Sequence, residues 1–411
     1  MRSAIAVTIA PAALVAVAVA ILLVLHAAGA GFQGDPLAVV RDAAPDDRLW
    51  DVAARRGPVI GVTLLVWLAA FGLAMAVSRE RAGRIASRLL ALSLVYLPLT
   101  CLVAAAIEPS VGVERLLVML GSPALAALTL AALGGYRALA CACALTAVAY
   151  AVDLIAGSPL TQLSLVGPNP AGGHRFYGIG NELEATLVVL ILVGTGAALS
   201  SFVGSTPPQG RQGASAGFGP AAFLVVAAIF SFVFAYGRYG ADVGAAITLP
   251  LGAAVAAALL ANRPRLALLA FALPIPALAI LSAADLLTGA NAHLTRTVLD
   301  ADSGGDVLAV FGHRLREAGE SFGRTILLVC LPFVVASAVV AWLRRDRLAL
   351  WLRGLPAMRA GMLGALAATL VGTLANDSGA LLLELGAVYL LAFVGFAWAE
   401  SDRTGAARDI V

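Results

Sequence analysis

The sequence predicts an all-α fold, a polytopic bundle of transmembrane helices, and three observations lead to it. Hydrophobic residues make up 61% of the 411 residues and charged residues only 12%, about half their share in soluble domains. The mean hydropathy is +0.94. Apolar runs of about 20 residues, the length at which a helix crosses the hydrocarbon core of a bilayer, recur along the chain. The lipid bilayer is therefore the expected partner, and a net charge of +3 is too small to indicate nucleic acid.

Windows of this length predict about twelve spans, which form a single integral membrane domain over residues 1–411. The expected spans lie near residues 4–30, 58–78, 89–108, 117–135, 138–156, 183–204, 217–236, 243–262, 266–287, 325–343, 358–375 and 380–399. The first span ends at Ala28-Gly29-Ala30, which resembles a signal-peptide cleavage site. Its apolar run is longer than a signal core usually is, so an uncleaved first span is favoured over a cleaved one.

The arginines predict the orientation of these spans. If the spans alternate, most arginine clusters fall in short loops on one side, the densest being Arg79, Arg81, Arg84 and Arg88. The positive-inside rule places that side, and with it both termini, in the cytoplasm of a bacterial cell whose inner membrane holds the protein. A pair of arginines at the end of the loop over residues 32–57 argues weakly against this orientation.

Cysteine and metal chemistry are not indicated. The three histidines outside the cytoplasm are dispersed without metal-ligand spacing, so no metal site is predicted. No nucleotide-binding loop or other cofactor motif occurs, and the cofactor is unknown. The cysteines all fall inside apolar runs and are interpreted as small buried hydrophobic residues. They are Cys101, Cys141, Cys143 and Cys330.

With this topology the informative polar segments lie in extracytoplasmic loops, over residues 157–182 and 288–324. The first loop leads into a polar, glycine-rich stretch over residues 172–184, just where an apolar helix begins. Arginine binds phosphate or carboxylate bidentately, and histidine can act as an acid or base near neutral pH. The stretch supplies Glu182 as a catalytic candidate. It supplies as substrate-binding candidates His174, Arg175, Tyr177 and Asn181.

Three predicted spans begin with the same kind of sequence on the extracytoplasmic side. Each has a carboxylate or amide beside glycine, at residues 180–185, 240–245 and 376–380. One interpretation is that these residues are ordinary helix N-caps. The other is that three helix starts of the same sense converge on one pocket, where their partial positive charge attracts anions. The second interpretation adds to the candidates Arg238, Asp242, Asn376 and Asp377.

The loop over residues 288–324 contains further histidines and arginines. Near residues 306–322 the apolar positions repeat at helical intervals, which predicts an amphipathic helix on the outer membrane surface. A role in gating the substrate and simple packing on the bundle both fit this helix. His293 and His313 are the candidates for acid–base catalysis, and Arg296 and Arg314 are candidates for binding an anion.

Two resemblances follow from these motifs. The motifs at residues 174–182, 240–244 and 376–379 together resemble a group of polytopic membrane proteins of actinobacteria and firmicutes, from about residue 160 onward. That resemblance implies a shared site. The layout, with about twelve spans and a loop bearing histidine and arginine between the ninth and tenth, resembles O-antigen ligases and polymerases. It is a likeness of architecture, which is a weak guide to function.

The sequence leaves open whether the protein is an enzyme, and it is compatible with two specific function classes and with a third interpretation, a membrane scaffold for cell-envelope assembly. The first is an extracytoplasmic site for an anionic substrate, lipid-linked and phosphate-bearing, such as a polyprenyl-phosphate-linked glycan. The reaction would be glycan or phosphoryl transfer in envelope assembly. Here the arginines would hold the anion, His293 or His313 would transfer the proton, and Glu182 and Asp242 would orient their partners.

The alternative is a secondary transporter coupled to protons or sodium ions. Asp242, Asp377 and Glu384 would take the cation, because ionisable residues at membrane depth are costly and serve function. Glycine-interrupted helix starts would then be hinges. The two classes differ in how far the polar site extends across the membrane. An enzyme needs a pocket that opens outward only, whereas a transporter needs a polar path that continues to the other side.

Overall fold

The computed structural model describes residues 47–77, 80–168, 177–202, 218–273, 319–323, 325–376 and 378–401, and the single residues 276, 280, 312 and 316. This part of the chain is helical and contains no β-strand. Its helices are α3 (Asp47–Val77), α4 (Arg81–Ile107), α5 (Val111–Leu116), η1 (Leu117–Gly121), α6 (Ser122–Leu133), α7 (Gly135–Ile155), η2 (Thr161–Leu163), α8 (Asn181–Phe202), α10 (Phe218–Ala235), α11 (Val243–Leu260), η4 (Pro264–Ala272), α15 (Thr325–Leu343), α16 (Arg345–Trp351), α17 (Pro356–Ala375) and α18 (Gly379–Glu400).

The prediction of an all-α, multi-pass membrane bundle is confirmed. Within the described residues, nine helical segments are long and apolar enough to cross a membrane, and each corresponds to an expected span. Of the remaining expected spans, the first, at residues 4–30, lies outside the described residues. The expected span at residues 325–343 appears as α15. The expected span at 266–287 begins as the 3-10 helix η4. Pro274 and Pro276 follow it and cannot donate the backbone hydrogen bonds of an α-helix.

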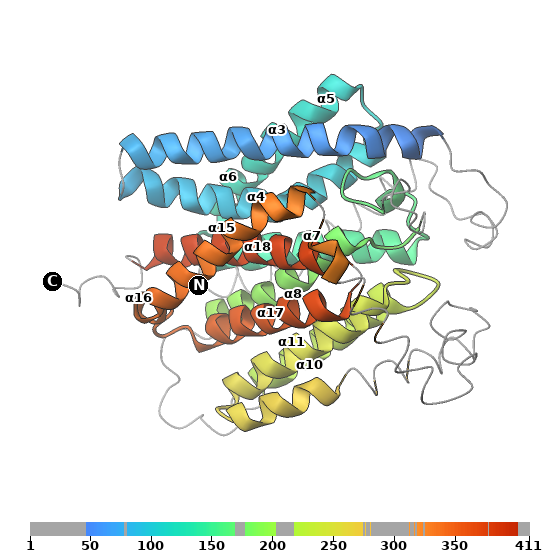
Figure 1. The fold of residues 1–411 in the computed structure, drawn as a ribbon. Helices are drawn as coiled ribbons and strands as arrows, with labels where there is room; N and C mark the ends of the chain where they lie inside the picture. Colours follow the sequence, from blue (N-terminus) through green and yellow to red (C-terminus); the bar gives the residue numbers. More distant parts are fainter. Residues whose placement is uncertain are drawn as a thin grey trace, which may run out of the picture.

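The spans run side by side, with α3 and α4 along one side of the bundle and α10 and α11 along the other (Figure 1). Between them lie α7, α8, α17 and α18. The helices α8, α11 and α18 begin at one end of the bundle, here called the motif end. The opposite end, where α4 begins with Arg81, Arg84 and Arg88, is called the arginine end.

The span over Val111–Leu133 is not a single regular helix. Its central part, η1, is a π-helical turn that joins α5 to α6. Pro123 follows this turn and cannot donate to the carbonyl one turn earlier, which is a common cause of such local widening. Across this region Trp67 Nε1 of α3 donates to the Met119 carbonyl at 2.9 Å. The peripheral helix α3 is thereby tied to the irregular turn.

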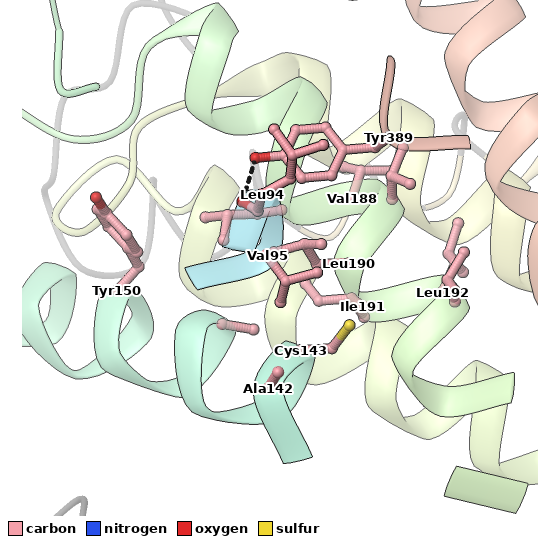
Figure 2. Packing of buried hydrophobic residues seen from close by; sticks show 14 of the residues in the cluster. Leu94, Val95, Ala142, Cys143, Tyr150, Val188, Leu190, Ile191, Leu192 and Tyr389 are labelled. Carbon is pink, nitrogen blue, oxygen red and sulfur yellow. Dashed lines mark hydrogen bonds between the residues drawn. The ribbon is translucent and has the colours of Figure 1, made fainter. Parts of the chain in front are cut away.

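The centre of the bundle is a packed apolar core formed by α4, α7, α8 and α18 (Figure 2). Tyr150, Cys143 and Leu190 are fully or almost fully buried there. The hydroxyl of Tyr389 donates to the Leu94 carbonyl at 3.0 Å, so even the polar atom of this ring is satisfied. In lipid, such close packing and internal hydrogen bonding hold helices together, because burial from water is not available as a driving force.

Glycines allow α8, α11 and α17 to touch backbone to backbone toward the arginine end. A Cβ atom on Gly364 of α17 would collide with the carbonyl oxygen of Gly252 in α11 and lie 3.0 Å from the Ala256 Cβ. A Cβ atom on Gly361 would lie 2.6 Å from the Leu192 carbonyl oxygen of α8. Small residues at helix contacts are typical of membrane bundles. These contacts close the bundle on the arginine side of the site described below.

Buried polar side chains fix both ends of the bundle. At the motif end, Asp153 of α7 accepts hydrogen bonds from the backbone of Leu160 at 3.1 Å and from Thr161, which secures the segment after α7. At the arginine end, Arg88 of α4 pairs with Glu400 of α18 at 2.6 Å. The Asp153 bonds hold the turn after α7, and the Arg88–Glu400 pair joins two neighbouring helices that are far apart in the sequence.

Candidate functional site

The three glycine-flanked sequences lie together at the motif end. Asp242 caps α11, because its Oδ1 atom accepts the Gly244 amide at 3.0 Å. Asn376, at the C-terminal end of α17, accepts the Ser378 amide at 3.0 Å and thereby shapes the turn into α18. Such local bonds are the usual reason for Asp and Asn at these positions. The capping interpretation thus holds for Asp242, whose helix start also lies together with the starts of α8 and α18.

Glu184, in the first turn of α8, is the centre of the cluster. Its side chain is fully buried. Thr248 of α11 donates to its Oε1 atom at 2.9 Å, and the Asn376 side chain donates to its Oε2 atom at 2.9 Å. The same Asn376 amide lies 3.2 Å from the Asn181 Oδ1 atom. One carboxyl group therefore connects α8, α11 and the turn between α17 and α18.

A second carboxyl group lies against the first. The side chains of Glu184 and Asp242 both lie against Gly244, whose amide donates to the Asp242 Oδ1 atom at 3.0 Å, and Asp242 is only 5% exposed. Two neighbouring buried carboxyl groups repel each other when both are ionised, and a shared proton or a bound cation would relieve that repulsion. Gly244 makes the approach possible, since a Cβ atom there would lie 2.8 Å from the Glu184 Oε1 atom. The close approach of the Glu184 side chain thus explains why this motif has glycine at position 244.

A small cavity of about 10 Å³ adjoins Glu184, which is about the space of one water molecule. Its polar wall consists of the Glu184 carboxyl and the hydroxyls of Thr248 and Thr369, while Ala185, Val188, Ala368 and Leu382 complete it. Thr248 is also bonded to the Gly244 carbonyl at 3.0 Å. The polar residues that line this otherwise apolar cavity carry side-chain oxygen atoms, which are the ligands of hard cations and of water.

The segment before α8 packs tightly against the turn before α11. Gly178 has a positive φ of 77°, which glycine adopts without strain. A Cβ atom there would collide with the Gly240 carbonyl oxygen, and the neighbouring Ile179 amide donates to that oxygen at 3.0 Å. The glycines at 178 and 240 thus bring two backbones together, and Ser158 adds a bond to the Gly178 amide at 3.3 Å.

Arg56 of α3 closes the motif end of the bundle beside this cluster. Its guanidinium pairs with the Glu182 carboxylate at 3.5 Å and donates to the carbonyls of Gly167 and Pro168. The Arg56 side chain is 13% exposed. Glu182, two residues from Glu184, faces a different side of α8. It therefore meets α3 at the rim of the site, whereas Glu184 meets α11 inside it.

Replacing Arg56 by glutamine is expected to lower the free energy of unfolding by about 2 kcal/mol, because two carbonyls and a carboxylate lose a charged donor. The matched control is Arg48→Gln. Arg48 pairs with Glu108 at 3.2 Å with both side chains more than half exposed, so its loss costs about 0–1 kcal/mol. Thermal unfolding in detergent measures both. An Arg56→Gln midpoint as high as that of Arg48→Gln would contradict the role of Arg56.

The other predicted residues are placed as follows. Tyr177 is half-buried directly before the Gly178 turn, and Arg238 is exposed in the turn between α10 and α11. Glu384 is half-buried on α18, two turns from the start of that helix. The rest of the proposed set lies outside the described residues, and its arrangement stays a prediction. It consists of His174, Arg175, His293, Arg296, His313, Arg314 and Asp377, with most of the expected amphipathic helix.

Three residues of the cluster were not singled out by sequence reasoning: Arg56, Glu184 and Thr248. Glu184 had a signal, because a carboxylate one turn inside an apolar helix is costly unless it has partners. The sequence gives no such signal for Thr248, since a threonine in an apolar helix commonly donates a hydrogen bond to a backbone carbonyl of the same helix. Arg56 is 126 residues from Glu182, and in the sequence it counted only toward the orientation of the chain.

The chain matches no protein-family model, no curated protein and no solved structure. The geometry of the site is therefore the basis of the functional argument.

Proposed function

We propose that the protein is a cation-coupled secondary transporter whose coupling site is the Glu184–Asp242 pair. The observation that carries the proposal is the placement of these two buried carboxyl groups on either side of Gly244, at the start of two spans, with a cavity of the size of one water molecule beside Glu184. Buried ionisable groups are expensive in a membrane and are kept where they bind an ion or proton. The cation is a proton or a sodium ion.

The surroundings of the pair support reversible binding. A permanent ion pair would need an arginine as partner, whereas here the Glu184 carboxyl receives neutral donors, Thr248 and Asn376. Neutral donors stabilise the charged form but do not neutralise it, so a proton or a sodium ion can still bind. The ligands come from three helices, so a change of helix packing would alter the affinity. Such a dependence is what couples ion binding to a conformational change.

The packing on either side of the pair also fits one state of an alternating-access cycle. Toward the arginine end, the Gly252–Gly364 contact between α11 and α17 leaves no room even for a methyl group. Toward the motif end, the cluster is covered by short turns and by Arg56. A transporter would open one of these two closures at a time, with the broken helix starts serving as the moving parts.

Charge movement on a solid-supported membrane tests the proposal. Proteoliposomes of the wild type should give a transient current after a sodium-ion jump or a pH jump. Glu184→Gln and Asp242→Asn should abolish it, because the amides keep the shape of the side chains but cannot take a cation. Glu108→Gln is the matched control, since Glu108 is 57% exposed and, among the described residues, pairs with Arg48. Equal currents from the wild type and Glu184→Gln would overturn the proposal.

The proposal includes the finer topology. About twelve spans would form one domain in a bacterial inner membrane, with both termini in the cytoplasm. The motif end, with the loops over residues 157–182 and 288–324, would then face outward. Alternation of the described spans supports this arrangement, because α4 begins and α18 ends at the arginine end. Cysteine labelling at Arg48 and at Arg347 from outside the cell would test it, with reaction expected at the first position only.

A second candidate is the enzyme for an anionic, lipid-linked substrate with a phosphate group. The observation that favours it is the position of Arg56, which puts a guanidinium at the rim of the site beside Glu182. His293 or His313 would transfer the proton, and Arg175, Arg238, Arg296 and Arg314 would bind the phosphate. A lipid phosphate that copurifies with the wild type and with Glu184→Gln but is lost from Arg175→Ala would favour this candidate over the transporter.

A further inference from the structure

A large apolar groove lies between α3 and α4, toward the arginine end and away from the carboxyl pair. Its volume is about 430 Å³, within the range of pockets that bind small molecules. Phe71 and Ala74 of α3 form one wall, and Ala82 and Ala86 of α4 form the other. Small alanine side chains thus line the groove on both helices.

The lining of the groove is poorly suited to binding water. Its two polar side chains are already satisfied, since Ser93 donates to the Leu89 carbonyl at 2.6 Å and Trp67 donates to the Met119 carbonyl at 2.9 Å. A buried water molecule needs two to four polar partners. An empty gap of this size would forfeit the packing contacts that stabilise helices in lipid. The occupant that suits the walls is therefore a hydrocarbon chain.

The dimensions of the groove fit a single lipid chain. The lining residues of α4 extend from Ala82 to Ser93, which corresponds to about 17 Å at 1.5 Å per residue. The hydrocarbon core of a bilayer is about 30 Å thick. The groove thus extends over about one leaflet, beginning at the arginine end.

The mouth of the groove carries positive charge. Arg81 is exposed and directly precedes Ala82 in the first turn of α4. The residue before it, Glu80, makes no side-chain bond to the first amides of the helix, and the first amides of a helix have no partner within the helix. A helix start and an arginine together favour an anion, although the exposed Glu80 carboxylate offsets part of the effect. Arg84 is engaged elsewhere, donating to the Trp398 carbonyl at 2.6 Å.

We propose that this groove binds one anionic phospholipid, with an acyl chain between α3 and α4 and the phosphate at Arg81 and the start of α4. The lipid would act as a structural filler that fixes α3, a peripheral helix, against the bundle. This site is separate from the carboxyl pair, so the two proposals stand or fall independently.

Native mass spectrometry with added lipid tests the proposal. The probes are phosphatidylglycerol and phosphatidylcholine with identical chains, titrated into the purified full-length protein in detergent. The wild type should retain one phosphatidylglycerol and should prefer it about fivefold, since one arginine near a headgroup contributes about 1 kcal/mol. Arg81→Gln should keep the bound lipid and lose that preference.

Filling the groove should remove the lipid. Ala86→Phe places a ring where the chain lies and should weaken binding of both lipids at least tenfold. Ala74→Phe, from the facing helix, is a second variant with the same expectation in case the first does not fold. Ala131→Phe on the exposed face of α6 is the matched control and should bind as the wild type does. Unchanged lipid binding in both folded filling variants, or no lipid preference in the wild type, would overturn the proposal.

Discussion

Asn376→Asp should abolish the cation response and lower the free energy of unfolding by about 3–5 kcal/mol, the cost of an uncompensated buried charge. The Asn376 amide donates to Glu184 at 2.9 Å and lies 3.2 Å from the Asn181 side-chain oxygen. The substitution changes one atom of the side chain and removes both donor hydrogens. It places a third carboxyl group against the Glu184–Asp242 pair, so like charges meet in a site with little water.

The sign of the pH dependence follows from the same contact. A protonated carboxyl group can donate to Glu184 again, whereas an ionised one can only accept. The deficit of Asn376→Asp relative to the wild type should therefore shrink as the pH falls and grow as it rises. Thermal unfolding of the two proteins across a series of pH values measures this difference directly.

Asn262→Asp is the matched control for this prediction. Asn262 follows α11 at the arginine end, is exposed, and has a φ of 56°. Aspartate is tolerated in this left-handed conformation almost as well as asparagine. The same chemical change should thus have little effect there. If Asn376→Asp were as stable and as active as Asn262→Asp, the cluster would be solvated or open, and the coupling site would lie elsewhere.

The spans could be predicted from the sequence because membrane-crossing helices depend on local composition. A run of about 20 apolar residues predicts a span whatever surrounds it. The nine described spans follow this rule, and the convergence of the starts of α8, α11 and α18 follows from their common direction. The expected span at 266–287 begins differently, as a 3-10 helix, and two prolines that cannot donate backbone hydrogen bonds follow it. Local composition was thus sufficient to predict a span where apolar residues dominated a window of the sequence.

The interior of the candidate site depends on contacts between distant residues, and no local pattern reveals these. Glu182 and Glu184 look alike in the sequence, yet one meets Arg56 at the rim and the other meets Thr248 inside. The two side chains point about 200° apart around α8, so their roles depend on which helices pack on each face. The partner helices are 126 residues earlier and 64 residues later in the chain.

Gly364→Ala should destabilise the bundle by about 1–3 kcal/mol, although alanine is the better helix former. The added methyl group would collide with the Gly252 carbonyl oxygen and crowd the Ala256 Cβ atom at 3.0 Å. The helices α11 and α17 would have to move apart, and the contact that closes the site toward the arginine end would open. We expect a lower unfolding midpoint in detergent and, with it, a cation response altered in size or rate.

The matched control has the opposite expected sign, which makes the comparison decisive. Gly72 lies on the exposed face of α3, and a Cβ atom there would meet nothing within 4 Å. Gly72→Ala should therefore stabilise the protein by about 0.5–1 kcal/mol, the ordinary gain from replacing glycine within a helix. If both variants shifted the midpoint upward, α11 and α17 would not be in backbone contact. Opposite shifts would show that the close approach of these two helices, rather than helix propensity, determines stability at Gly364.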